Sequence, residues 1–400
     1  MPRVNKPRCG SLAVYPRKKA KKETPSFSSF PVLHLKDNEG SRPLNFFGYK
    51  AGMTHIMGKD SHEKGTTFGH EVSVSVTVIE TPPIKVFGAR AYCKAKTGYY
   101  GTVPLMDVFA QSQDKHLLRR MPNFRQKKSG KEKQEGKAKK EAHARGIDDL
   151  AKEKARITEI RLLCHSQPVF TTIGKKKPAI FEVALCGNVG QQLSFAKEKL
   201  GKELRVNDVF SQLQFIDVRA VSKGKGMQGP VKRFGVRTLR RKAKKEKIVG
   251  SIGPWHPATV MWTVPRPGQM GYHSRTEYNK RILRVGAANE AAGVSPAGGF
   301  KNYGGLQSDF LIVAGSVVGP AKRAIGLRQP IRKLPVVRNK VDSIDYIATS
   351  GGKDAAFIEE DGKAQKVQAA KEEKAVKKSV EDEILTAAKG EEKREKKKEI

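Results

Sequence analysis

The chain has 400 residues, of which 78 are Lys or Arg and 40 are Asp or Glu, so its formal net charge is +38 and its pI is about 10.1. Self-repulsion at that charge disfavours a compact free protein, and a polyanion relieves it, so nucleic acid is the leading partner. No apolar run approaches the ~20 residues that span a bilayer, and no amphipathic helix or lipid anchor stands out, which disfavours a membrane partner. The hydrophobic content of 38% still permits one or two sizeable cores.

Residues 1–43 are expected to form an extended, basic N-terminal arm. Glu23 is the first acidic residue, and three early prolines suppress helix. The segment has the charge of a signal peptide but lacks its hydrophobic centre, which predicts an intracellular, cytoplasmic location. A solubilising tail is the alternative interpretation. The arm residues expected to bind RNA are Arg3, Lys6, Arg8, Arg17, Lys18 and Lys19.

A β-rich body is expected to begin at residue 44 and continue through 44–110. Valine alternates with other residues over 71–80, and this period of two is typical of a half-buried strand. Apolar runs at 45–57 and 84–95 predict further strands. We interpret the three runs as a β meander.

Residues 111–178 are expected to form a basic, α-rich insertion, because a Lys-, Gln- and Gly-rich run continues into 147–165, which has helical composition and spaced apolar residues. Strand character resumes in 179–221 and 272–343. Several short β runs divided by long basic insertions favour a mixed β fold with a barrel-like core. The tail, 344–400, mixes Ala, Glu and Lys and is expected to be a solvated helix or disordered.

The segment 222–271 carries the strongest functional signal. A glycine-rich basic half precedes a proline-rich aromatic half, and Glu246 is the single acidic residue between Val218 and Thr276. With little apolar surface to bury, it should form a long loop that takes its shape from a polyanion. Guanidinium groups bind phosphates and flat rings stack on unpaired bases, which suits folded RNA better than duplex DNA. The RNA-binding residues expected in this segment and directly after it are Lys223, Gly224, Lys225, Gly226, Lys232, Arg233, Arg237, Arg240, Arg241, Lys242, Trp255, His256, Arg266, His273 and Arg275.

The two tryptophans of the chain differ in context. Trp255 lies in the turn-like run 253–257, between two prolines, and is expected at the tip of the loop. Trp262 lies in the apolar run 259–264, which fits either a buried strand or an exposed loop.

No enzymatic motif accompanies these residues. Residues 224–229 fit G-x-G-x-x-G, but the βαβ context of a dinucleotide site is missing, so the glycines are interpreted as allowing close approach to phosphates. His256 and His273 lack a nucleophile elbow, a metal-binding helix or paired carboxylates. We expect no catalytic residue, metal, cofactor or small-molecule substrate. The cysteines are far apart, which predicts reduced thiols at Cys9, Cys93, Cys164 and Cys186.

Four runs, in order along the chain, together resemble one known family. They are 45–54 (NFFGYKAGMT), 217–226 (DVRAVSKGKG), 253–258 (GPWHPA) and 268–276 (GQMGYHSRT). Over about residues 1–340 the chain resembles the large-subunit ribosomal protein L-three family in its archaeal and eukaryotic form.

The resemblance implies a β-barrel body of the translation-protein type, joined to an α/β insertion, with the N-terminal arm and the central loop running inward through rRNA. It implies that Trp255 lies near the peptidyl transferase centre, that the protein supports early subunit assembly beside other large-subunit ribosomal proteins, and that it is not an enzyme. Two features depart from the family. The basic run before Trp255 has no histidine, so the histidine methylation of eukaryotic relatives does not carry over, and the tail beyond about residue 340 has no counterpart.

Two other functions stay open on the residues alone. An RNA-modifying enzyme with a β-barrel RNA-binding domain would need a substrate pocket and would associate substoichiometrically with precursor particles. A DNA-compacting protein would bind duplex DNA with comparable affinity, and the aromatic loop argues against it.

Overall fold

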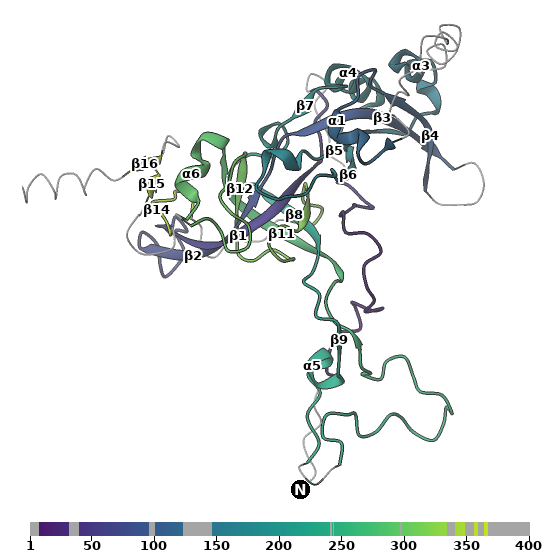
Figure 1. Cartoon of the computed structure of the whole chain (residues 1–400), viewed down its shortest axis with the longest axis vertical. Helices are drawn as coiled ribbons and strands as arrows, with labels where there is room; N and C mark the ends of the chain where they lie inside the picture. The colour runs from purple at the N-terminus through teal and green to yellow at the C-terminus, as the bar shows by residue number, and fades with distance from the viewer. Residues whose placement is uncertain are drawn as a thin grey trace, which may run out of the picture.

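The computed structural model describes residues 8–31, 40–95, 101–122, 146–240, 242, 244–296, 298–333, 341–348, 356–358 and 364–366. Two β-sheets lie side by side, and a long, narrow extension projects away from them (Figure 1). The expectation of a mixed, predominantly β fold is confirmed. Within the ranges given above, no helix has the length and hydropathy needed to cross a membrane.

Six strands of the larger sheet are hydrogen-bonded in a closed ring. In order around the ring they are β1 (Asn45–Lys59), β2 (Glu71–Glu80), β12 (Phe310–Ala314), β11 (Ser274–Gly286), β8 (Phe215–Val221) and β13 (Ala324–Arg328), and every neighbouring pair is antiparallel. The ring closes because β1 is long enough to pair with β13 through its first residues and with β2 through the rest. Asn45 therefore lies opposite Arg328, and Lys59 lies opposite Glu71.

The alternation over 71–80 is confirmed as the strand β2. Burial follows the alternation only in the first half of the strand, where Ser73 and Ser75 are exposed and Val72 and Val74 are partly buried, whereas all five residues from Val76 to Glu80 are buried. Successive side chains of a strand point to opposite faces, so β2 meets solvent with one face in its first half and is covered on both faces in its second half.

The smaller sheet contains four antiparallel strands in the order β4 (Thr102–Phe109), β3 (Ile84–Lys94), β5 (Glu159–His165) and β6 (Ile180–Ala184), with β7 (Glu203–Leu204) also paired to β3. The helix α4 (Val189–Lys199) contacts β5 and buries Leu193 and Ala196. Among the described residues, the other helical segments of this part are short: α1 (Lys115–Leu118), α3 (Ile147–Lys152), η2 (Lys154–Arg156), η3 (Pro168–Phe170) and η4 (Val206–Asp208).

The expected meander is wrong. β2 pairs with β1 and β12, whereas β3 pairs with β4, β5 and β7 in the other sheet. Pro82 and Pro83 follow β2, and proline cannot donate a ladder hydrogen bond, so the chain leaves the ring at this point. As a result, β3 and β4, and later in the chain β6 and β7, belong to the smaller sheet rather than to the ring.

The helix expected through residue 165 is also wrong beyond residue 156. Glu159–His165 is the strand β5, which pairs with β3 on one side and β6 on the other. Its last four residues are all buried, because this strand lies inside the sheet. Tertiary pairing therefore overrides local helix propensity there, while α4 was not expected.

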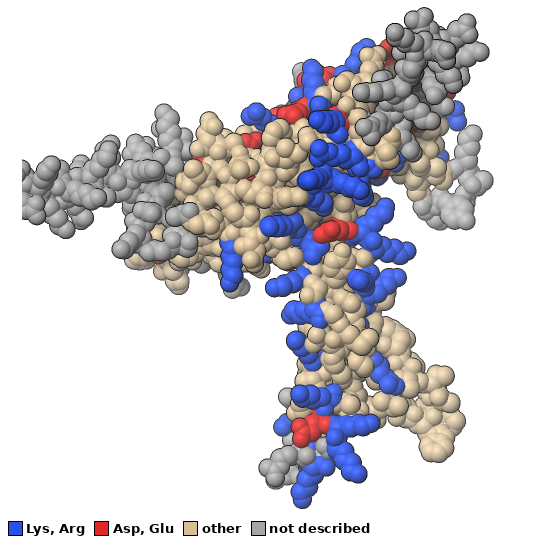
Figure 2. All heavy atoms as spheres, viewed as in Figure 1, with Lys and Arg blue, Asp and Glu red and all other residues tan. Residues whose placement is uncertain are grey.

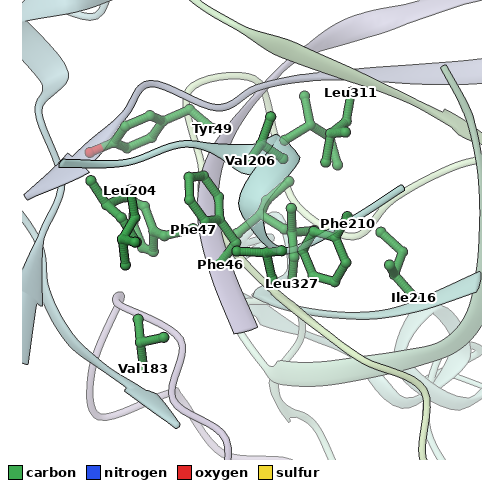
Figure 3. Close-up of a cluster of buried hydrophobic side chains, with 14 of the residues drawn as sticks. Phe46, Phe47, Tyr49, Val183, Leu204, Val206, Phe210, Ile216, Leu311 and Leu327 are labelled. Atoms are coloured by element: carbon green, nitrogen blue, oxygen red, sulfur yellow. The ribbon is translucent and has the colours of Figure 1, made fainter. Parts of the chain in front are cut away.

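One hydrophobic core joins the two sheets (Figure 3). Phe46, Ile216 and Leu327 enter it from the ring, and Val183 and Leu204 enter it from the smaller sheet. The two sheets therefore form one packed body.

The boundary expected for the tail at residue 344 is wrong by a few residues. Ile344 and Ile347 are buried, and β14 (Tyr346–Ile347) pairs with β1. Two further short strands, β15 (Ala356–Ile358) and β16 (Ala364–Lys366), continue the pairing at this side. The rest of the tail lies outside the described residues. Two turns between β11 and β12 complete the body, η5 (Ala288–Glu290) and α6 (Ala291–Val294).

Candidate nucleic-acid interface

The extension leaves the ring between β8 and β11 and begins as a two-stranded stem. β9 (Met227–Gln228) pairs with β10 (Gly268–Gln269). Nearer the ring, backbone hydrogen bonds connect the outgoing and returning segments of the stem: Ser222 N to His273 O at 2.9 Å, Lys225 N to Met270 O at 2.9 Å and Met270 N to Gly226 O at 2.9 Å. The stem therefore continues the β8–β11 ladder away from the body.

Gly271 allows the two chains of the stem to approach each other. Its φ is +71°, and a Cβ at this position would lie 2.1 Å from the carbonyl oxygen of Lys223. A side chain would therefore suffer both an unfavourable backbone conformation and a backbone clash, so glycine is required here.

Beyond β9 lies the single-turn helix α5 (Pro230–Phe234). Proline at its start suits the first helical turn, and Gly235, with φ +70°, ends it in the left-handed conformation. The turn directs Arg233 back onto the stem, where its guanidinium donates to the carbonyl oxygens of Gln269 at 3.0 Å and Arg266 at 2.9 Å. Arg233 therefore connects the outgoing and returning chains.

The N-terminal arm lies along this stem (Figure 1). Arg17 Nη1 donates to Arg233 O at 3.0 Å, and Arg233 Nη2 donates to Arg17 O at 3.1 Å. The Arg17 guanidinium also lies 4.3 Å from the centre of the Phe234 ring, and Tyr15 packs edge-on against Trp262 at 5.2 Å. We call Tyr15, Arg17, Arg233, Phe234 and Trp262 the arm–loop cluster. Sequence reasoning missed it, because nothing in either segment identifies a partner more than 200 positions away.

Beyond α5, the loop divides into two parts of different charge. A basic lobe, 235–247, carries seven Lys or Arg residues and Glu246, whereas an uncharged lobe, 248–265, carries no Lys, Arg, Asp or Glu. Figure 2 shows this contrast: Lys and Arg side chains follow the extension, but one branch of it has none. Every residue of 251–262 is exposed, and Trp255 is 89% exposed.

The sequence of the chain matches one protein family over most of its length. Residues 1–351 match the family described as Ribosomal protein L3. The chain belongs to the ribosomal protein L3 family.

Named archaeal relatives of this L3-family chain cover nearly the same span. The large ribosomal subunit protein uL3 of Methanosphaera stadtmanae is 43% identical over 357 residues, which is 88% of this chain and 98% of that protein. The uL3 proteins of Methanocaldococcus jannaschii and Archaeoglobus fulgidus are each 41% identical over 87% of this chain, covering 97% and 98% of their own lengths.

The predicted RNA-binding residues of this L3-family member fall into four groups. The exposed ones are Arg8, Lys18, Lys19, Lys223, Gly224, Lys225, Gly226, Lys232, Arg237, Arg240, Lys242, Trp255, His256 and Arg266. Arg17, Arg233 and Arg275 are half-buried, and His273 is buried, with its Nδ1 3.0 Å from Lys18 O. Arg3, Lys6 and Arg241 lie outside the described residues. RNA binding by all of them stays a prediction, but Arg17, Arg233 and His273 already have partners within the chain.

Trp262 is 63% exposed and lies outside any strand, so the strand interpretation of 259–264 is wrong. Its aromatic contact is to the arm rather than to the core.

Acid–base and metal chemistry have little support in the described part of this L3-family chain. No group of three His, Cys, Asp or Glu side chains there could hold a metal ion. The four cysteines are free thiols, and burial raises the pKa of Cys164 well above its usual range, which keeps it protonated.

Burial, followed by the charge of Arg17, lowers the pKa of Arg275. Such a guanidinium stays charged, and a nearby anion would stabilise it.

Proposed function

We propose that this L3-family protein is a structural constituent of the large ribosomal subunit and that its arm and extension bind large-subunit rRNA. The observation that carries the proposal is the extension itself. It holds nine Lys or Arg residues and one Glu over 232–247, and it projects from the body as a long, narrow loop. Such a surface needs a partner with closely spaced negative charges, and RNA phosphates supply them.

Binding would proceed mainly by charge neutralisation. The exposed cations of the stem and the basic lobe would contact phosphate oxygens, and the exposed Gly224 and Gly226 would allow RNA to reach the backbone. The arm–loop cluster supports this function because it orders the N-terminal arm and the loop against each other in the free protein. Less conformational entropy would then be lost on binding, which favours a role in early subunit assembly.

The uncharged lobe would bind RNA in a different way. It cannot neutralise phosphates, but the exposed rings of Trp255 and Trp262 can stack on unpaired bases. We infer that this lobe reaches the functional RNA core, toward the peptidyl transferase centre, as the resemblance implies for Trp255. Peptide-bond chemistry would belong to the RNA, and the protein would act structurally rather than as an enzyme.

The body would anchor the extension. We infer that the closed ring of six strands is the β-barrel of the translation-protein type, and that the outer surfaces of the body meet neighbouring large-subunit proteins. The protein would accordingly be located in cytoplasmic ribosomes.

Limited proteolysis and subunit fractionation test the proposal. Trypsin should cut the free chain within 237–247, where the described Lys and Arg residues are exposed, and these sites should be protected in the large subunit. The chain should also be present at one copy per large subunit. Equal cleavage in both states, or presence only on a small fraction of precursor particles, would contradict the proposal and favour the RNA-modifying enzyme.

A further inference from the structure

A half-buried arginine on the outside of the ring has no carboxylate beside it. Arg219 lies on β8 between Gly326 of β13 and Thr276 of β11, and neither neighbour carries a negative charge. Within the described ranges no ion pair involves Arg219. Phe27 and Pro25 of the arm cover Gly326. A Cβ added to this glycine would lie 3.0 Å from the Phe27 ring. Arg219 therefore lies next to the place where the arm packs against the ring.

The carboxylate two residues before Arg219 on β8 is paired with another arginine. Asp217 is fully buried, and its Oδ2 accepts a hydrogen bond from Arg328 Nη2 at 2.6 Å. Its Oδ1 accepts the backbone N–H of Asn279 at 3.1 Å. Burial, followed by the charge of Arg328, lowers the pKa of Arg219. The charge of Arg219 thus stays uncompensated, which costs free energy that a bound anion would recover.

An aromatic ring lies near Arg219, and a second arginine packs against that ring. Tyr278 of β11 is close enough to affect the ionisation of Arg219 and is 39% exposed. The Arg332 guanidinium lies 3.8 Å from the centre of the Tyr278 ring and is itself exposed. Asn279 Nδ2 donates to Lys333 O at 2.9 Å, which holds this segment against β11. The arrangement combines two positive charges with a flat ring and guanidinium plane.

We propose that Arg219, Tyr278 and Arg332 form a separate RNA-binding site on the outer face of the ring, which takes one unpaired nucleotide and its flanking phosphates. The two guanidinium groups bind the phosphate oxygens, and the Tyr278–Arg332 pair stacks on the base. The site lies outside the arm and the extension, so RNA would contact the body as well as its projections. This inference rests on the proposed function, because the ligand is taken to be rRNA.

Ultraviolet cross-linking to a transcript of large-subunit rRNA tests the site in the full chain. Trypsin releases Tyr278 within residues 276–280, a peptide separate from those of the arm and the loop. A nucleotide adduct on this peptide is expected for the natural sequence. The variant Arg219→Gln/Arg332→Gln should reduce the adduct at least about tenfold, because bidentate charged contacts are lost.

The matched control is Lys59→Gln/Lys64→Gln, which removes two exposed charges from the β1–β2 hairpin and should leave the adduct unchanged. Relative to the control, the site variant should also lower the slope of log K against log salt by about 1.4, since each phosphate contact with unpaired RNA contributes about 0.7. If Arg219→Gln prevents folding, Arg332→Gln alone provides the test, because Arg332 is exposed.

The outcomes separate this site from the proposed function. Adducts on the arm and the loop without one on 276–280, or equal adducts in the site variant and the control, would overturn the site and leave the proposed function standing. An absence of RNA binding by the natural chain would overturn both.

Discussion

At the scale of single residues, burial determines how side chains behave that look alike in the sequence. His165 and His256 both follow an apolar or aromatic neighbour, yet His165 is fully buried at the end of β5 and His256 is exposed. Burial lowers the pKa of His165 below its ordinary value of 6.5, although Asp114 and a hydrogen bond with Ser166 oppose the effect. His165 is thus a neutral core residue.

The lowered pKa of His165 predicts a pH-dependent stability. The unfolded chain binds a proton on this histidine near pH 6.5, whereas the folded chain resists binding it. Its contribution to the free energy of unfolding is therefore present in full above pH 6.5 and is lost as the pH falls below that value. Urea midpoints at about pH 7.5 and 5.5 should differ less for His165→Gln than for the natural chain. The control His256→Gln should keep the natural difference, and an unchanged difference in His165→Gln would contradict the prediction.

Gly271 provides a second prediction at this scale. In Gly271→Ala, the added Cβ would meet Lys223 O at the base of the stem, and a left-handed non-glycine residue alone costs about 1–2 kcal/mol. The stem should open, so trypsin should cut the free chain within 222–247 at least about fivefold faster, while the melting temperature of the body stays unchanged. Gly229→Ala is the matched control, because Gly229 has a φ of −67° and open space around its Cβ position. Equal cleavage of the two variants would show that Gly271 is not needed to close the stem.

At the scale of elements, the extension separates charge from apolar surface along one loop. The basic lobe follows α5 directly, and the uncharged lobe returns the chain to β10. The arm–loop cluster holds the base of both lobes, with Arg17 and Arg233 each donating to the other's backbone carbonyl. The two lobes can therefore meet different parts of an RNA while sharing one rigid base.

Salt titration should distinguish the two lobes. In Arg237→Gln/Arg240→Gln/Lys242→Gln, the slope of log K for rRNA against log salt should fall by about 2, because three phosphate contacts are lost at about 0.7 each. In Trp255→Ala the slope should stay unchanged, while affinity falls by about tenfold through lost stacking. The melting temperature of Trp255→Ala should equal that of the natural chain, since this ring is 89% exposed. A changed slope in Trp255→Ala would contradict the division of roles.

At the scale of the whole molecule, acidic and basic groups are distributed unevenly. Most ion pairs between described residues lie in the body, such as Arg90 with Asp107 and Arg328 with Asp217, whereas the extension has few carboxylates to offset its cations (Figure 2). In the free protein, no bound polyanion offsets the net charge of +38. Self-repulsion of this kind opposes folding and favours assembly with RNA.

Salt should therefore act in opposite directions on the free and assembled protein. The melting temperature of the free chain should rise between about 0.05 M and 0.5 M sodium chloride, over which the screening length falls roughly threefold. The affinity for rRNA should fall over the same range. Scanning fluorimetry and filter binding measure the two effects. A melting temperature that falls with salt would contradict the role assigned to self-repulsion.

The sequence by itself determined the local features of this protein. The alternation over 71–80, the apolar runs of the other strands and the contrast between 235–247 and 248–265 are properties of neighbouring residues, so periodicity and composition reveal them. The family resemblance also came from contiguous motifs, and it covers most of the chain.

Tertiary structure alone decided which elements meet. It placed β3 in the smaller sheet, closed the ring through β1 and β13, and joined Arg17 to Arg233 across 216 positions. It also left Arg219 without a carboxylate partner, because Asp217 forms its ion pair with Arg328. A strand's alternation specifies which of its faces is buried, but its neighbours and the partners of its charges depend on packing between segments far apart in the chain.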